Sequence, residues 1–176
     1  MARRHRLDRD KAMQVLLYVV SRVPNMYNAL KVIYFADRQH LAQYGRFIYG
    51  DSYVAMKHGP VPSTAYDFLK NARGDGEWSC DPAIAEHVQE YFRGSDRDHT
   101  VTALQPPDLD FLSESDRECL DEAIEKYGHL SFAKLRHISH NDKAFRAADE
   151  NDWMPPEAIA RSLPNADELL EYLESV

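Results

Sequence analysis

The sequence predicts an α+β fold that is predominantly α-helical, in which a small antiparallel hairpin or three-stranded sheet packs on the helices. Apolar side chains recur at helical spacing over most of the 176 residues. Short aromatic and β-branched runs bounded by turn residues occur around residues 46–56 and 98–104. A chain of this length with 44% hydrophobic residues is long enough for one buried core and short for two, so we expect a single domain.

Polar residues and glycines mark the ends of the predicted helices. Asn25 and Ser113 are residue types that favour the N-cap position, and Ser113 with Asp116 has the spacing of a capping box. Gly45 and Gly128 suit the C-terminal ends of helices. We therefore expect helices over residues 7–23, 25–45, 63–72, 83–92, 115–128, 131–140, 141–150 and 155–176, the last of them interrupted at Pro164.

The predicted sheet centres on a hairpin. Residues 46–49 and 52–56 are strand-like runs on either side of a Gly-Asp turn signal. A lone hairpin is marginally stable, so residues 98–104 are expected to add a third strand. In the following segment, KHGPVP at residues 57–62, Lys57, His58 and Gly59 are predicted to break the strand, and the prolines favour extended backbone that leads directly into a helix. Its two prolines restrict the backbone, and a rigid segment loses little entropy on binding.

Composition and charge exclude several classes of protein. The net charge of −8 argues against nucleic acid as a partner, because a DNA-binding surface must be basic. The chain begins with a basic stretch and ends with an acidic one, residues 149–176. It contains no apolar run long enough for a membrane span. Cys80 and Cys119 are far apart and match no zinc or disulfide pattern, so we expect reduced thiols and a cytoplasmic protein.

Asp37 interrupts the apolar stripe of the helix predicted at residues 25–45. A carboxylate on such a face must meet hydrogen-bond donors or a cation. In one interpretation it is structural and is held by backbone N–H groups or by Lys57. In the other it is a catalytic or metal-binding acid. We expect the structural role for Asp37 and for His40, which lies three residues further along the same helix.

The chain shows none of the common catalytic signatures. G-x-S-x-G, H-E-x-x-H, P-loop and G-x-G-x-x-G patterns are absent, so we expect no enzymatic activity, no cofactor and no metal. One alternative is a metal-dependent hydrolase, because acids and histidines at i, i+3 spacing are able to ligate a metal if they meet in space. The residues for that alternative are Asp37, His40, His58, His137 and His140.

Aromatic and basic residues alternate between positions 44 and 66. Tyrosine and arginine are enriched at protein interfaces. These side chains therefore either contact a protein partner or lie half-buried on a small sheet. The candidate partner-binding residues are Tyr44, Arg46, Tyr53, Met56, Lys57, His58, Val61 and Tyr66.

Residues 30–70 resemble the core of the SocA-like antitoxin family, also known as the Panacea domain. The family pattern has a Tyr-Phe-Ala-Asp run, His-Leu, Tyr-Gly, a hairpin with a Gly turn, and Gly-Pro-Val followed by Tyr. The matching positions are Tyr34, Phe35, Ala36, Asp37, His40, Leu41, Tyr44, Gly45, Gly50, Tyr53, Ala55, Gly59, Pro60, Val61 and Tyr66. Residues 112–128 and 135–145 resemble the second half of the family, although Phe145 stands where a Trp is expected.

This resemblance implies an antitoxin of a bacterial or phage toxin–antitoxin pair. Such a protein neutralises a cognate protein toxin by direct binding, and a variant of the mechanism delivers the toxin to a protease or chaperone. We expect a basic tail at residues 1–9, the Panacea-like domain at 10–150, and an acidic helical extension at 151–176 packed on that domain. A DNA-binding regulator that uses Arg3, Arg4 and Arg6 is the other alternative.

Overall fold

The computed structural model describes residues 7–74 and 82–175. Predominantly helical, with small antiparallel sheets, it confirms the predicted fold class. Its elements are α1 (Arg9–Val20), α2 (Met26–Tyr44), β1 (Tyr53–Met56), β2 (Gly59–Pro62), α3 (Ser63–Ala72), α4 (Pro82–Tyr91), β3 (Phe92–Gly94), β4 (Val101–Ala103), a 3₁₀ turn (Leu109–Phe111), α5 (Glu114–Tyr127), α6 (Phe132–His140), α7 (Lys143–Ala147), β5 (Trp153–Met154), α8 (Pro156–Arg161) and α9 (Ala166–Ser175).

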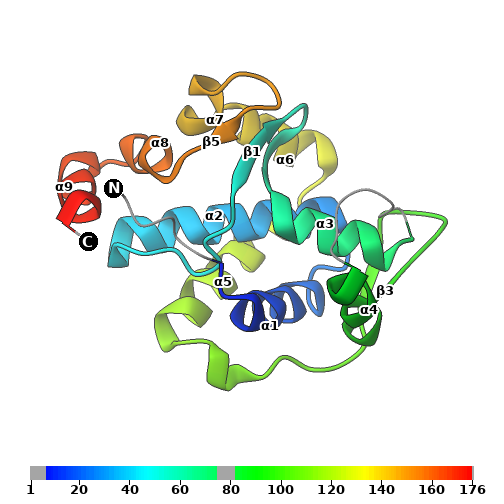
Figure 1. The fold of residues 1–176 in the computed structure, drawn as a ribbon. Helices are drawn as coiled ribbons and strands as arrows, with labels where there is room; N and C mark the ends of the chain where they lie inside the picture. The colour runs from blue at the N-terminus through cyan, green and yellow to red at the C-terminus, as the bar shows by residue number, and fades with distance from the viewer. Residues whose placement is uncertain (1–6, 75–81, 176) are drawn as a thin grey trace.

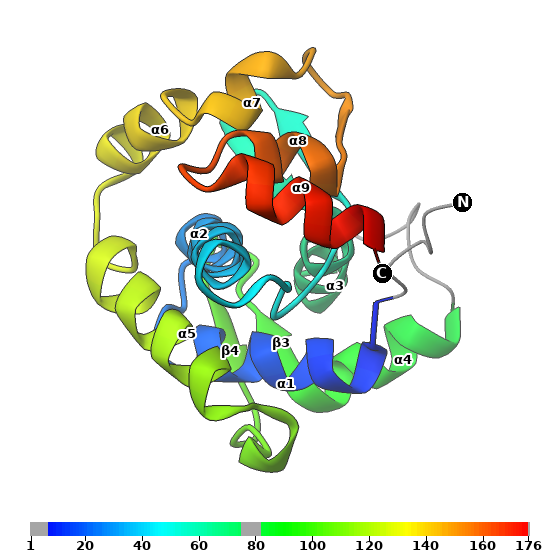
Figure 2. The same ribbon diagram turned by 90° about the vertical axis from the view of Figure 1, so that its left-hand side faces the viewer.

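Helix α2 is the centre of the fold. Seen end-on in Figure 2, it is surrounded by α1, α5, α6, α3 and the two C-terminal helices. Ala29, Val32 and Tyr34 point in different directions around this helix, and all three are fully buried. A charged residue on the buried part of this helix must therefore find a partner inside the protein.

The predicted ends of α2 and α5 agree with the structure. The Asn25 side chain accepts a hydrogen bond from the backbone N–H of Asn28 at the start of α2, and Gly45 ends that helix with φ 74°. At α5, Ser113 and Asp116 form both bonds of the predicted capping box. These local signals therefore place the two helices that pack most extensively against each other, α2 and α5.

The hairpin lies one segment later than predicted. Strand β1 pairs with β2, so that Met56 faces Gly59 across a turn made by Lys57 and His58. Residues 46–49 form no strand. Pro60 and Pro62, which were expected to favour extended backbone, lie inside β2. They are tolerated there because β2 is an edge strand in the order β2-β1-β5 and its missing N–H groups cost no ladder bonds. Figure 1 shows this hairpin standing on one side of α2.

The third strand of this sheet was also predicted wrongly. Residues 101–103, as β4, pair with β3 in a separate two-stranded sheet. The backbone N–H of Val101 also donates to the carbonyl of Pro24, which holds β4 against the end of α1. The third strand beside β1 is β5, near the C-terminus. A short strand close to its partner in sequence, as β4 is to β3, closes the smaller loop, which is the cheaper pairing in entropy.

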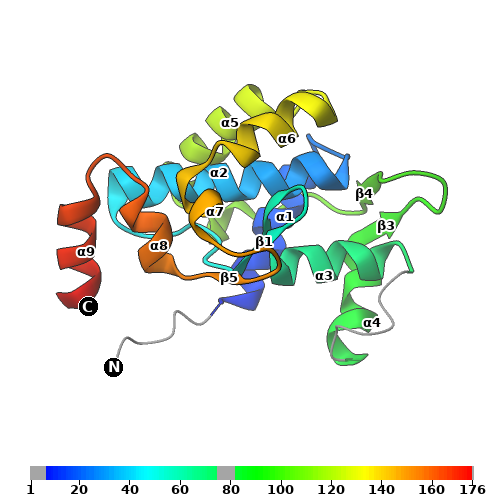
Figure 3. The same ribbon diagram turned by 90° about the horizontal axis from the view of Figure 1, so that it is seen from above.

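The C-terminal helices cover one end of α2. The Asn165 side chain donates to the carbonyl of Ala42 at 2.9 Å, and the Tyr172 ring lies next to Gly45. Figure 3 shows α9 beyond the C-terminal end of α2. The domain boundary at residue 150 stays a prediction, although β5 lies beyond it and pairs with β1.

Gly59 is the tightest position in the hairpin. Its φ is +114°, and a Cβ atom there would lie 2.6 Å from the Cβ of Ser139 on α6. We expect Gly59→Ala to destabilise the protein by roughly 2–4 kcal/mol in chemical denaturation, because strain and a steric clash add together. Gly74→Ala is the matched control, since Gly74 has φ +80° but a methyl group there would have no neighbouring atom within 4 Å. Equal losses in both variants would show that the contact with α6 is not tight.

Candidate protein-binding surface

Asp37 fixes the loop that follows α2. Its carboxylate is fully buried and accepts bonds from the backbone N–H groups of Ile48 at 2.7 Å, Tyr49 at 2.8 Å and Gly50 at 3.0 Å, and from the Tyr53 hydroxyl at 2.6 Å. The structure therefore has backbone donors, not Lys57, around this acid. Burial raises the pKa of Asp37 and these four bonds oppose that rise. The loop does not pair as a strand because the N–H groups of Ile48, Tyr49 and Gly50 already donate to Asp37.

His40 belongs to a second buried polar cluster. Its Nδ1 lies 2.9 Å from the carbonyl oxygen of Arg46, and its Nε2 lies 2.9 Å from the Ser115 hydroxyl. Burial lowers the pKa of His40. Asp116 completes the cluster, pairing with Lys11 at 2.8 Å and with Arg46 at 2.9 Å. The cluster joins α1, α2 and α5, and its groups are partnered with one another.

The β1–β2 turn is held by contacts from two helices. The Tyr27 hydroxyl of α2 donates to the carbonyl of His58 at 2.8 Å. From α6, Arg136 Nε donates to His58 Nδ1 at 3.1 Å, and His140 Nε2 lies 3.0 Å from the carbonyl oxygen of Lys57. The turn is therefore preorganised, and the Lys57 side chain remains exposed at its tip.

Lys31, on α2, contacts the same hairpin. It is fully buried, its Nζ donates to the carbonyl of Pro60 at 2.6 Å, and it lies 5.0 Å from the centre of the Tyr27 ring. Burial lowers the pKa of Lys31 to about 7. The carbonyl that this bond satisfies lies on the edge strand β2, so Lys31 ties the hairpin to α2.

An exposed aromatic side chain borders the turn. Phe132, the first residue of α6, is 50% exposed, and its ring lies 4.7 Å from Tyr27 and 5.2 Å from His58 between ring centres. Phe132, Arg136 and His140 follow one another at steps of four, so they share one stripe of α6. This stripe was not predicted from the sequence, although the spacing of its three residues was a signal for it.

The predicted binding residues fall into separate groups. Met56, Lys57 and His58 lie at the turn, whereas Tyr44 and Arg46 lie at the opposite end of α2. Tyr44 is exposed, but Arg46 is already paired with Asp116. The structure does not bring these two groups together.

Three further predicted residues are poorly placed for contact. Tyr53 and Val61 are buried, at 2% and 8% exposure. Their assignment to the contact surface is therefore corrected: Tyr53 faces the core because its hydroxyl bonds to Asp37, and Val61 packs in the main core. Tyr66 on α3 is half-buried, with Lys70 4.6 Å from its ring centre.

The histidines of the metal hypothesis do not converge with Asp37. His58 and His140 lie at the turn, while Asp37 and His40 have the separate partners described above. Among residues 7–74 and 82–175, no three His, Cys, Asp or Glu side chains are grouped so that they could hold a metal ion. The arginines of the DNA-binding hypothesis, at positions 3, 4 and 6, lie outside the described residues.

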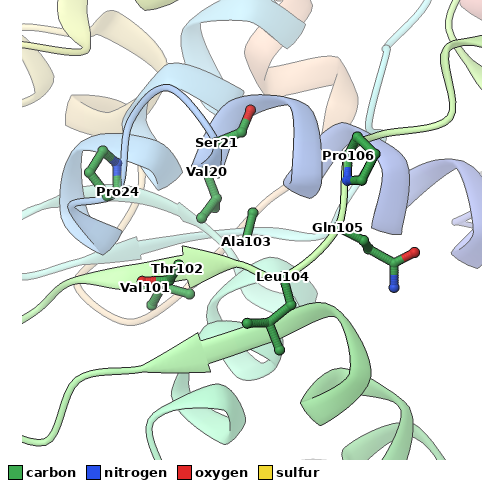
Figure 4. Close-up of a pocket in the computed structure, with 9 residues that line it drawn as sticks. All are labelled: Val20, Ser21, Pro24, Val101, Thr102, Ala103, Leu104, Gln105 and Pro106. Atoms are coloured by element: carbon green, nitrogen blue, oxygen red, sulfur yellow. The ribbon is translucent and has the colours of Figure 1, made fainter.

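Two surface grooves differ in the chemistry of their linings. The first, about 450 Å³, runs between β4 and the end of α1 and has no titratable side chain in its lining (Figure 4). The second, about 430 Å³, lies between α2 and α5, and its lining includes Arg38, Glu122, Lys126 and Tyr127. No helix in the part of the chain that the structure describes combines the length and apolar character needed to cross a membrane.

A comparison with models of protein families gives a match over most of the chain. The model of the family described as antitoxin SocA-like, Panacea domain, matches residues 30–145, which is more than half of the chain. The chain belongs to this family. No curated protein and no solved structure gave a match. The matched residues of the Panacea domain run from the first turns of α2 into α7, so they include the hairpin and all of α6, while α1, α8 and α9 lie outside the match.

Proposed function

We propose that this protein is the antitoxin of a toxin–antitoxin pair, and that it neutralises a cognate protein toxin in the cytoplasm by binding it directly. Membership of the SocA-like antitoxin family supports the role. The proposal includes no catalytic step, in keeping with the absence of catalytic motifs from the sequence.

The preorganisation of the β1–β2 turn is the observation that supports placing the contact surface there. Three hydrogen bonds from α2 and α6 hold the turn, so a partner meets it without ordering a flexible loop. Beside it, Phe132 provides an exposed aromatic ring and Lys57 an exposed charge. Aromatic anchors surrounded by polar groups are typical of the energetically important parts of interfaces. We name Lys57, His58, Phe132, Arg136 and His140 the turn surface.

The experiment that tests the function is a growth assay on the neighbouring gene. We expect that gene to encode a protein that is toxic when it is induced alone, and expect growth to be restored when this protein is co-expressed. A pull-down from the surviving cells should then recover both proteins. Rescue with loss of the toxin from the cells would favour delivery to a protease or chaperone. The absence of toxicity would contradict the proposed function.

A charge reversal at the turn tests the placement. Lys57→Glu is expected to weaken neutralisation at least several-fold while the melting temperature stays nearly unchanged, because an exposed charge affects binding more than folding. Arg161→Glu is the matched control, since Arg161 is an exposed cation on α8, away from the β1–β2 turn. Titrating antitoxin expression against toxin expression measures the effect. Unimpaired neutralisation by Lys57→Glu would show that the turn is not in contact with the toxin.

A further inference from the structure

The turn surface lies on two segments that contain no acidic residue, and a third such segment, at the start of α2, contacts it. The chain has 29 Asp and Glu residues, yet none occurs in residues 24–36, 53–66 or 128–141. These segments are far apart in sequence, and the contacts of His58 with Tyr27, Phe132 and Arg136 bring all three together. In a protein of net charge −8, three segments without carboxylates therefore meet at the β1–β2 turn.

Several cations elsewhere in the protein are paired with carboxylates. Lys11, Arg22, Arg38 and Arg46 each lie within 4 Å of an aspartate. Within the described parts of the chain, neither Lys57 nor Arg136 has such a carboxylate partner. Their positive charge is therefore not neutralised internally and is available to a partner.

The pKa of His58 is affected by the same positive charges. Its pKa is lowered, first by burial and then by the positive charges of Arg136 and Lys57. Nearby carboxylates would raise the pKa of a histidine. The contributions of Arg136 and Lys57 to this shift agree with a positive potential at the turn.

Acidic residues lie along the other edge of β1. The backbone of residues 151 and 152 bonds to Ala55, with Asn151 N–H donating at 2.6 Å and Asp152 O accepting at 2.9 Å. Because β1 lies between β2 and β5, this acidic loop occupies the β5 side of the sheet, whereas α6 packs against β2. A partner that approaches from the α6 side meets the cations and Phe132 first.

From these observations we infer that the turn surface binds an acidic segment of the toxin that carries an apolar side chain among its carboxylates. The carboxylates pair with Lys57 and Arg136, and the apolar side chain covers the exposed ring of Phe132. This inference rests on the proposed function, because it names the part of the toxin that the antitoxin recognises. Charge complementarity of this kind speeds association and selects the partner.

The test uses the purified full-length protein and the purified product of the neighbouring gene. Equilibrium affinity is measured for the wild type, for Lys57→Glu, for Arg136→Glu and for the charge-conserving Arg136→Lys, at low and at high salt. Each reversal is expected to weaken binding by roughly tenfold or more at low salt, and Arg136→Lys by much less. The wild-type affinity is expected to fall as salt rises, and that fall should be smaller in the reversed variants.

A second arm identifies the segment on the partner. Lysine substitutions in an acidic stretch of the toxin should weaken its binding to the wild type and restore its binding to Lys57→Glu. Wild-type binding with no loss in Lys57→Glu, or with no dependence on salt, would overturn this inference and leave the proposed function standing. A neighbouring product that is neither toxic nor bound would overturn both.

Discussion

Replacing Asp37 with alanine is expected to lower the free energy of unfolding by about 3–5 kcal/mol, a large part of the stability of a domain of this size. The carboxylate is completely buried and accepts four hydrogen bonds. Alanine would leave three backbone N–H groups and the Tyr53 hydroxyl without their acceptor. Each buried donor that loses its partner costs about 1–3 kcal/mol, and water entering the loop would recover part of that sum.

Asparagine has nearly the same shape as aspartate but no charge and fewer acceptor oxygens. The variant Asp37→Asn therefore tests how much of the stabilisation depends on the charge and on the second acceptor. The Asn side chain has one acceptor oxygen, so its NH₂ group would face either Ile48 and Tyr49 or Gly50 and Tyr53, all of which donate. We therefore expect Asp37→Asn to lose most of the stability that Asp37→Ala loses.

The measurement is urea denaturation, with a surface acid as reference. Asp110→Ala removes an exposed carboxylate and should change stability by less than about 0.5 kcal/mol. A stable Asp37→Ala protein that fails only in neutralisation would instead place Asp37 in the functional site.

Much of this core was predictable because its signals are local. The position of Asp37 on an apolar stripe already required buried donors, and the caps at Asn25 and Gly45 fixed the helix that carries it. The hairpin was misplaced because residues 46–49 look like a strand. The N–H groups of Ile48 and Tyr49 are taken by an acid on the preceding helix. No local pattern shows where a side chain from another element will compete for the backbone.

The turn surface was predictable only in part. Lys57 and His58 were identified because they lie between a strand-like run and a proline-rich one. The side chain of Arg136 reaches His58 across 78 positions of sequence, and spacing within one segment does not reveal such a contact. Tyr53 was assigned to the surface because the sequence alone did not show which face of its strand points to the core. The alternating burial along β1 places Tyr53 and Ala55 on the core side.

Lys31 gives the second large prediction, a pH-dependent stability. Its pKa is lowered by burial to about 7 in the folded protein, from an ordinary value of 10.5. Between these two pH values the unfolded chain binds a proton that the folded chain does not, so the contribution of Lys31 to stability rises with pH. Below about pH 7 the lysine is charged in both states, and the full cost of burying its charge is present.

The variant Lys31→Met isolates this contribution, because methionine has a similar shape and does not titrate. We expect the stability of the wild type relative to Lys31→Met to increase as pH is raised from about 7 towards 10, by at most about 1.4 kcal/mol for each pH unit. The total difference across this window is expected to reach several kcal/mol. Lys31→Met also loses the bond to the carbonyl of Pro60. Above the pH range in which Lys31 titrates, this loss changes the stability difference between the two proteins by a constant amount.

Urea denaturation of both proteins at a series of pH values measures the difference. Groups that titrate alike in the two proteins contribute equally to both stabilities and cancel in the difference. The nearby Tyr27 stays protonated in the folded protein across the window, since burial raises its pKa to about 12. A difference that does not change with pH would mean that Lys31 keeps its charge when the protein is folded. In that case the Pro60 carbonyl and the Tyr27 ring would compensate the ammonium group fully, and the hairpin would be tied to α2 by a buried cation at every pH in the window.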